Sequence, residues 1–184
     1  MPTLTIELPV QKDQTAFNLR RWQEILTDTE IGRELAKVRG RVETDRHGNI
    51  IMTPPPAFIH GNYQSEISHL LKTLLPDGRT ATECPISTAD GVRATDVAWI
   101  SHEKLAKIGE NVCLTKAPEI CVEVLSPGNT RVEMREKKAL YFAAGAREVW
   151  FCDERGRMTF LAGATSAGQR TSAFCPAFPK TVVL

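Results

Sequence analysis

The chain has 184 residues, 42% of them hydrophobic and 24% charged, and its formal net charge is +1. This length and composition predict one soluble globular domain with a core of its own and room for an extra terminal arm. No apolar stretch reaches the roughly 18 residues that a membrane-spanning helix needs, and the N-terminus lacks a signal-peptide pattern, so we expect a cytoplasmic protein with no membrane partner. A net charge near zero neither indicates nor excludes a nucleic-acid-binding protein, because a basic patch around an acidic site also gives a net charge near zero.

The cysteines indicate neither a zinc site nor a redox motif. There are five, an odd number, and no two of them form a C-x-x-C pair. Cys121 and Cys152 lie in apolar runs and are predicted to be small core residues. Reduced thiols are typical of a cytosolic protein.

The first half of the chain predicts helical segments on either side of a hairpin. Residues 2–8 alternate weakly in polarity, which indicates an arm or an edge strand. Residues 13–38 carry apolar side chains near helical spacing, and residues 41–52 have the glycine-containing turn of a β-hairpin. Three prolines at 54–56 end the hairpin and precede a predicted helix over about residues 58–75.

The second half predicts a sheet whose strands are interrupted by one helix. A capping box, Thr130-x-x-Glu133, begins that helix, and Gly145 ends it. The predicted strands cover residues 80–86, 94–101, 120–125, 148–153 and the run MTFL at 158–161. The order of elements predicts an α/β fold in which helices flank a mixed sheet.

Two of these strands each carry one acid on an otherwise apolar face. In ICVEVL, period-two alternation places Glu123 on the face of Cys121, and in TDVAWIS it places Asp96 on the face of Ala98. If the strands are neighbours, the two carboxylates converge, and they repel each other unless a proton or a cation lies between them. A hard divalent cation with oxygen ligands is the natural partner.

The helix that follows the second strand carries a lysine in its buried stripe. At about 100° per residue, Lys137 falls in the middle of the apolar arc, whereas Lys138 lies on its flank. A lysine in such a position requires a partner or a function. Because open α/β folds place their sites at the C-terminal ends of strands, Lys137 can meet Glu123 there. Lys138 is the alternative.

Two acids and a lysine suit the metal-assisted hydrolysis of a phosphodiester bond. The acids fix Mg²⁺ in an open coordination sphere, and the metal polarises the phosphate and lowers the pKa of a bound water. The lysine orients or deprotonates that water, or stabilises the developing negative charge. In the alternative interpretation Glu123 pairs with Lys137 only for structure, and Asp96 only caps a turn. Tyr141 and Trp150 are predicted to be core residues.

Four runs of sequence together resemble a known family. GNIIMTPPPAFIHG, TDVAWIS, APEICVEVLSPGNT and REKKALYFAAGAREVWFCD occur in this order over roughly residues 40–155, and they resemble the Uma2 family of restriction-endonuclease-like proteins. The resemblance implies a restriction-endonuclease-like core of the PD-(D/E)xK nuclease superfamily over residues 40–184, preceded by an N-terminal arm and helix in residues 1–39. It also implies dependence on Mg²⁺ or Mn²⁺, and DNA as the substrate.

The family's site residues can be placed on this sequence one by one. The resemblance implies Asp96 and Glu123 as metal ligands, together with the backbone carbonyl of Val124. The lysine expected two residues after the glutamate is replaced by Leu125. The resemblance implies that the following helix supplies the lysine instead, at Lys137, the position that the helical projection also selects.

Several other polar residues are candidates for roles near this site. Those that could support the metal are Glu43, His60 and Glu133. On the helix, Arg131, Arg135 and Lys138 form either a solvated face or a contact with DNA phosphates.

The sequence leaves two functions open. One is a Mg²⁺-dependent DNA endonuclease that uses the two acids and the lysine. The other is a non-catalytic DNA-binding or assembly module that retains the nuclease fold, which the near-neutral charge and Leu125 favour. In either case we expect Phe17, Trp22 and Leu26, exposed on the N-terminal arm, to form a homodimer contact.

Overall fold

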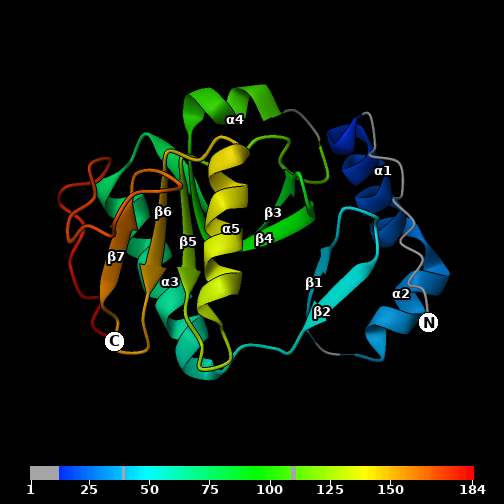
Figure 1. The fold of residues 1–184 in the computed structure, drawn as a ribbon, viewed down its shortest axis with the longest axis horizontal. Helices are drawn as coiled ribbons and strands as arrows, with labels where there is room; N and C mark the ends of the chain where they lie inside the picture. The colour runs from blue at the N-terminus through cyan, green and yellow to red at the C-terminus, as the bar shows by residue number, and fades with distance from the viewer. Residues whose placement is uncertain (1–12, 39, 109–110) are drawn as a thin grey trace, which may run out of the picture.

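Two helices lie at the start of the described part of the protein. The computed structural model describes residues 13–38, 40–108 and 111–184 (Figure 1). Helices α1 (Gln14–Thr27) and α2 (Thr29–Ala36) each begin with an aspartate, Asp13 and Asp28, whose carboxylate accepts hydrogen bonds from otherwise unpaired backbone N–H groups. The predicted helical character of residues 13–38 is confirmed, and the predicted arm at residues 2–8 lies outside the described residues.

Helix α1 packs onto the rest of the protein through Trp22. This side chain is only 7% exposed and lies in an apolar cluster with Ile25 and Cys113. The prediction of an exposed Trp22 is therefore wrong, because the apolar stripe of α1 is buried on the protein's own core, which removes the indole from water. Of the other two residues expected at a homodimer contact, Leu26 is 59% exposed and Phe17 is half-buried.

The predicted hairpin is confirmed as the antiparallel pair β1 (Arg41–Thr44) and β2 (Ile50–Thr53). Asp45 begins its turn and accepts hydrogen bonds from the backbone N–H groups of His47 and Asn49 at 2.8 and 2.9 Å. Gly48 takes the positive φ, 80°, that the turn requires. Helix α3 (Phe58–Leu74) begins after the prolines, as predicted.

In the described part of the chain, five strands form the central sheet, in the order β3-β4-β5-β6-β7. Their bounds are Gly78–Thr88, Gly91–Ser101, Ile120–Val124, Glu148–Cys152 and Met158–Leu161. Strands β5 and β6 are parallel and the other neighbours are antiparallel. Parallel neighbours need a crossover connection, and α5 (Arg131–Ala143) supplies it. The short helix α4 (His102–Ile108) follows β4. The predicted mixed sheet flanked by helices is confirmed.

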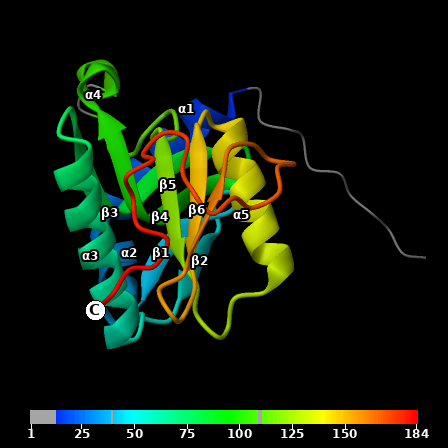
Figure 2. The same cartoon turned by 90° about the vertical axis from the view of Figure 1, so that its left-hand side faces the viewer.

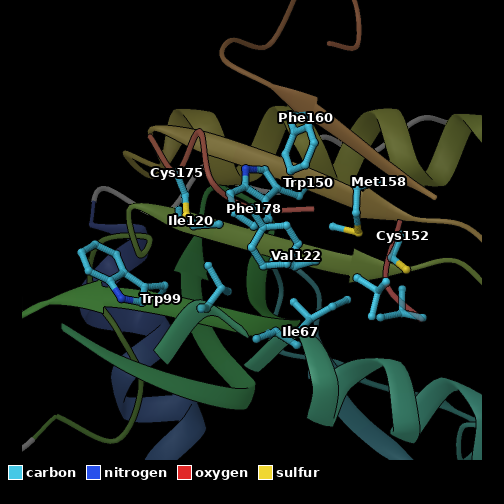
Figure 3. Close-up of a cluster of buried hydrophobic side chains, with 14 of the residues drawn as sticks. Ile67, Trp99, Ile120, Val122, Trp150, Cys152, Met158, Phe160, Cys175 and Phe178 are labelled. Atoms are coloured by element: carbon cyan, nitrogen blue, oxygen red, sulfur yellow. The ribbon is translucent and has the colours of Figure 1, made fainter. Parts of the chain in front are cut away.

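The sheet lies between two helices, with α3 on one face and α5 on the other (Figure 2). The main core fills the α3 side, where Ile67 and Leu71 of α3 meet side chains from alternating positions of the strands (Figure 3). These include Val97, Trp99, Ile120, Val122, Trp150 and Phe160. On the other side Ala98 and Cys121 pack with Tyr141 of α5. The predicted division of faces is confirmed, and it places both acids of interest on the α5 side.

Two further predictions concerned the cysteines and the absence of a membrane-spanning helix. All five cysteines are buried and unpaired, as predicted for Cys121 and Cys152. Among the described residues, no helix is both long and apolar enough to cross a membrane.

Candidate active site

The two acids lie on neighbouring strands at the same level of the sheet. Strands β4 and β5 are antiparallel and pair Val97 with Val122, so Asp96 and Glu123 are each one position beyond this pair. Their side chains are only 1% and 3% exposed. The backbone N–H of Val124 donates to Asp96 Oδ2 at 2.7 Å, which ties the acid of β4 to the end of β5. The predicted adjacency of the two acids is confirmed.

Lys137 reaches the acids from α5. Its Nζ lies 3.1 Å from Glu123 Oε2, and its side chain is 12% exposed. Lys138, the alternative, faces a different cavity. Leu125 lies just beyond β5, and its backbone N–H donates to the carbonyl of Cys152 at 2.8 Å. The structure therefore brings Lys137, and not Lys138 or residue 125, to the acid pair.

Arg41 holds the other acid and was not among the predicted residues. Its Nη1 and Nη2 lie 2.7 and 2.8 Å from Asp96 Oδ1, and Nη1 also donates to the carbonyl of Ala94 at 3.0 Å. Arg41 and Glu43 are two residues apart on β1, so they share a face of the hairpin. That spacing, together with the candidate Glu43, was the signal that could have pointed to Arg41.

Tyr141 is both a core residue and a partner of Glu123. Its ring is fully buried, as predicted. Its hydroxyl donates to Glu123 Oε1 at 2.6 Å and lies 3.2 Å from the carbonyl oxygen of Ala94. Tyr141 is four residues after Lys137, so the two side chains lie on one face of α5 and reach the two oxygens of the same carboxylate.

His60 connects α3 to the site. Its Nε2 lies 3.4 Å from Asp96 Oδ2, and its Nδ1 lies 3.1 Å from Ser126 Oγ in the loop after β5. The ring therefore spans from the acid of β4 to the loop that follows the acid of β5.

Of the other two candidates for supporting roles, Glu43 contacts the site and Glu133 lies at its edge. Glu43 is buried, accepts a hydrogen bond from the backbone N–H of Ala94 at 2.9 Å and lies 3.5 Å from Lys137 Nζ. Glu133 closes the capping box with Thr130, and its contacts lie within the start of α5 rather than with the acid pair. The structure brings Glu43 to the site and leaves Glu133 at its edge.

A distortion of β3 adds one more acid. Glu83 has a positive φ of 49°, which non-glycine residues rarely adopt. Its carboxylate accepts a hydrogen bond from Gln64 Nε2 at 2.6 Å and lies 3.3 Å from Arg41 Nε. Glu83 was not among the predicted residues, because its contacts come from two distant segments of the chain, α3 and β1.

The surroundings push the pKa values of the two acids apart. Burial, with a contribution from the charge of Asp96, raises the pKa of Glu123 to about 7, although Lys137 and Arg41 act in the opposite direction. Burial acts to raise the pKa of Asp96 too, but the hydrogen bond from His60, the charge of Arg41 and the Val124 N–H together hold it below its usual value. Asp96 is thus ionised, whereas Glu123 gains or loses a proton near neutral pH.

A cavity of about 450 Å³ gives access to these groups. Its lining includes four carboxylates and two permanently charged bases, which are Glu83, Asp96, Glu123, Glu133, Arg41 and Lys137. The excess of negative charge and the carboxylate oxygens fit a hard divalent cation. Within the described residues no group of three or more His, Cys, Asp or Glu side chains could hold a metal. A cation here would therefore keep water or phosphate among its ligands, as Mg²⁺ commonly does.

Comparison with known proteins identifies the family. The family model described as "Uma2: Putative restriction endonuclease" matches residues 33–177. The chain belongs to the Uma2 family. The match covers most of the chain, so the resemblance that the motifs indicated is confirmed.

A solved structure agrees with the Uma2 assignment. The crystal structure of a "putative nuclease" from Anabaena variabilis is similar to this chain with a TM-score of 0.62 and 16% sequence identity. The similarity covers 82% of this chain and 93% of the other. At this identity the likeness establishes the fold, which is the nuclease-like mixed α/β fold expected from the motifs. A comparison with curated proteins finds no match.

Proposed function

We propose that this Uma2 protein is a metal-dependent endonuclease that hydrolyses phosphodiester bonds in DNA. The observation that carries the proposal is the acid pair of β4 and β5 with Lys137 Nζ 3.1 Å from Glu123. The desolvation cost of a buried ion pair can exceed its Coulombic gain, so this pair is poorly explained by stability alone and favours a functional role. Strongly perturbed pKa values in a cavity are typical of catalytic sites, and Glu123 has such a pKa.

The metal in this proposal is Mg²⁺ or Mn²⁺. Asp96 and Glu123 would hold it, with the backbone carbonyl of Val124 as a further oxygen donor. When bound, the metal polarises the phosphate and lowers the pKa of a water molecule. These residues line one cavity, and their donors and charge suit such a cation.

The protein's own side chains have separate roles in the proposed reaction. Lys137 stabilises the negative charge that develops on the phosphate or orients the attacking water. Tyr141 positions Glu123, because its hydroxyl fixes one carboxylate oxygen while Lys137 holds the other. His60 and Arg41 position Asp96 from two sides.

Cleavage of a supercoiled plasmid tests the proposal. We expect Glu123→Gln and Lys137→Met each to lower the rate by about a hundred-fold or more, the range measured when one group that stabilises a transition state is removed. Glu136→Gln is the control, because it makes the same Glu-to-Gln change at an exposed acid of α5, next to Lys137. Cleavage that is metal-dependent and unchanged in Glu123→Gln would reject the proposal.

One observation favours the second candidate function, a non-catalytic module that keeps the nuclease fold. Both acids already have a cationic partner within hydrogen-bonding distance, Arg41 for Asp96 and Lys137 for Glu123. Calorimetric titration with Mn²⁺ separates the two functions. Saturable binding that is lost in Asp96→Ala supports the enzyme, and the absence of binding supports the module.

A further inference from the structure

A second and larger cavity lies beside the candidate active site. Its volume is about 740 Å³, and it is formed by the loop after β5, the first turns of α5 and the connection between β6 and β7. Figure 1 shows these segments at the same end of the sheet. We call this cavity the α5 groove. Five basic side chains line it, and they are Arg131, Arg135, Lys138, Arg155 and Arg157.

The positive charge of the α5 groove is largely uncompensated. Its two acids are Asp153 and Glu154, and Asp153 is paired with Arg157 at 2.7 Å. Helix α5 supplies three of the groove's bases, Arg131, Arg135 and Lys138. Within the described residues none of these three forms an ion pair with a carboxylate, whereas Lys137 of the same helix, which does not line the groove, pairs with Glu123. The whole chain has a formal net charge of only +1, so the positive charge is concentrated at this groove.

The three groove bases of α5 lie along one face of the helix. Arg131, Arg135 and Lys138 are spaced by four and three residues, which places them above one another. They span about 10 Å of helix axis, roughly three nucleotide steps of a DNA strand. Arg131 is also in the first turn of the helix, where the helix dipole adds to the attraction for a phosphate.

The α5 groove and the cavity of the acid pair share a wall. Ser126, Pro127 and Asn129 line both. Lys138 faces the groove, and the preceding residue, Lys137, contacts Glu123. A strand that lay in the groove would therefore pass next to the loop that borders the acids.

We propose that the α5 groove binds the phosphodiester backbone of the duplex DNA that the acid pair cuts. This inference rests on the proposed function and names the surface that holds the substrate. Unpaired arginines and lysines are the groups that contact DNA phosphates. An acidic protein segment would also be attracted to them, but the shared wall with two acids and a lysine favours a ligand that carries phosphodiester bonds.

The test measures DNA binding in EDTA, so that cleavage plays no part. The probe is a fluorescent 20-base-pair DNA duplex, titrated by anisotropy at several salt concentrations. For Arg131→Gln/Arg135→Gln/Lys138→Gln we expect at least a ten-fold loss of affinity. The slope of log K against log salt should also become shallower by about 2 to 3, since each phosphate contact contributes about 0.9. The double variant Arg131→Gln/Arg135→Gln keeps the half-buried Lys138. Its change in the slope should be about two thirds of that of the triple variant.

A control variant with the same change in net charge distinguishes a DNA-binding site in the α5 groove from a general effect of lower positive charge. Arg20→Gln/Arg33→Gln/Lys72→Gln removes three exposed bases of α1, α2 and α3. It should alter the slope by less than 1. An equal effect of the two triple variants, no effect of the α5 variant, or no DNA binding by the native protein would overturn the inference. So would preferential binding of an RNA duplex of the same sequence.

The failure of this inference can be distinguished from that of the proposed function. A native protein that binds DNA through the groove but never cleaves it supports the groove and contradicts the nuclease. A native protein that cleaves DNA and binds it equally well without the three bases contradicts the groove and supports the nuclease.

Discussion

Arg41 donates to a single oxygen of Asp96 through both of its terminal nitrogens, at 2.7 and 2.8 Å. The proposed function assigns the same carboxylate to the metal, so the guanidinium and a divalent cation compete for it. Arg41 has an alternative partner in Glu83, whose carboxylate lies 3.3 Å from its Nε. The Arg41–Asp96 pair therefore places a residue of the hairpin β1–β2 in contact with a proposed metal ligand.

Arg41→Gln should make the stability of the protein more dependent on metal. Removing one partner of a buried ion pair leaves the other charge uncompensated, which costs about 3–5 kcal/mol in the absence of metal. Mg²⁺ should restore part of this loss, since a bound cation takes over the neutralisation of Asp96 and stabilises the folded state by mass action. The measurement is the thermal midpoint in EDTA and at increasing Mg²⁺, for the variant and the native protein.

The control for this prediction is Arg46→Gln. Arg46 also comes from the hairpin and pairs with an acid, Asp90, but its side chain is 63% exposed. Exposed pairs contribute about 0–1 kcal/mol, so this variant should resemble the native protein at every Mg²⁺ concentration. If Mg²⁺ raises the midpoint of Arg41→Gln by no more than that of the native protein, Arg41 does not compete with a cation.

Tyr141→Phe should destabilise the protein although the ring remains in the core. The variant removes the 2.6 Å hydrogen bond to Glu123, and hydrogen bonds to charged groups contribute about 1.5–3 kcal/mol. Tyr63→Phe is the matched control, because within the described residues the Tyr63 hydroxyl forms no hydrogen bond; we expect a change below about 0.5 kcal/mol. Urea denaturation of both variants measures the difference, and equal stabilities would show that the Tyr141 hydroxyl does not support Glu123.

Stability in metal-free buffer should depend on pH through Glu123. Its pKa is about 7 in the folded protein against an ordinary value of 4.5, so the folded state binds the proton more tightly than the unfolded state. The stability that this group contributes is present below pH 4.5 and is lost as pH rises towards 7. Asp96, whose pKa is lowered from 3.8, has the opposite effect in a separate, more acidic range.

Glu123→Gln provides the comparison, since an amide does not titrate. The free energy of unfolding of the native protein minus that of the variant should decrease steadily between pH 4.5 and 7. Urea denaturation in EDTA at intervals of one pH unit measures this difference, with Glu136→Gln as the control for loss of an exposed acid from α5. A difference that stays constant across the range would contradict the raised pKa.

The parts of the structure that could be predicted from the sequence are those with regular periodicity. Period-two alternation places Asp96 and Glu123 on one face of the sheet, and the helical repeat places Lys137 in the buried stripe of α5. The features that could not be predicted depend on contacts between distant segments. Arg41 reaches Asp96 because β1 packs against β4, and the partner of Arg41 on β3, Glu83, is more than forty residues away in the sequence.

Trp22 shows the same limit. The helical repeat of α1 identifies an apolar stripe, but it cannot say whether that stripe faces the protein's own core or a second chain. Trp22→Ala should cost about 3–5 kcal/mol, the range for large aromatic side chains removed from a core. Leu26→Ala, in an exposed position of the same helix, should cost less than about 0.5 kcal/mol.

Light scattering of the Leu26 variant tests what remains of the homodimer prediction. If α1 contributes to a dimer through its exposed residues, Leu26→Asp should shift a native dimer to the monomer mass without changing the thermal midpoint of the monomer. This follows because a charge in an apolar interface is costly, whereas a charge on a free helix surface is not. A native protein that is already monomeric at high concentration would show that the exposed residues of α1 have no second chain to contact.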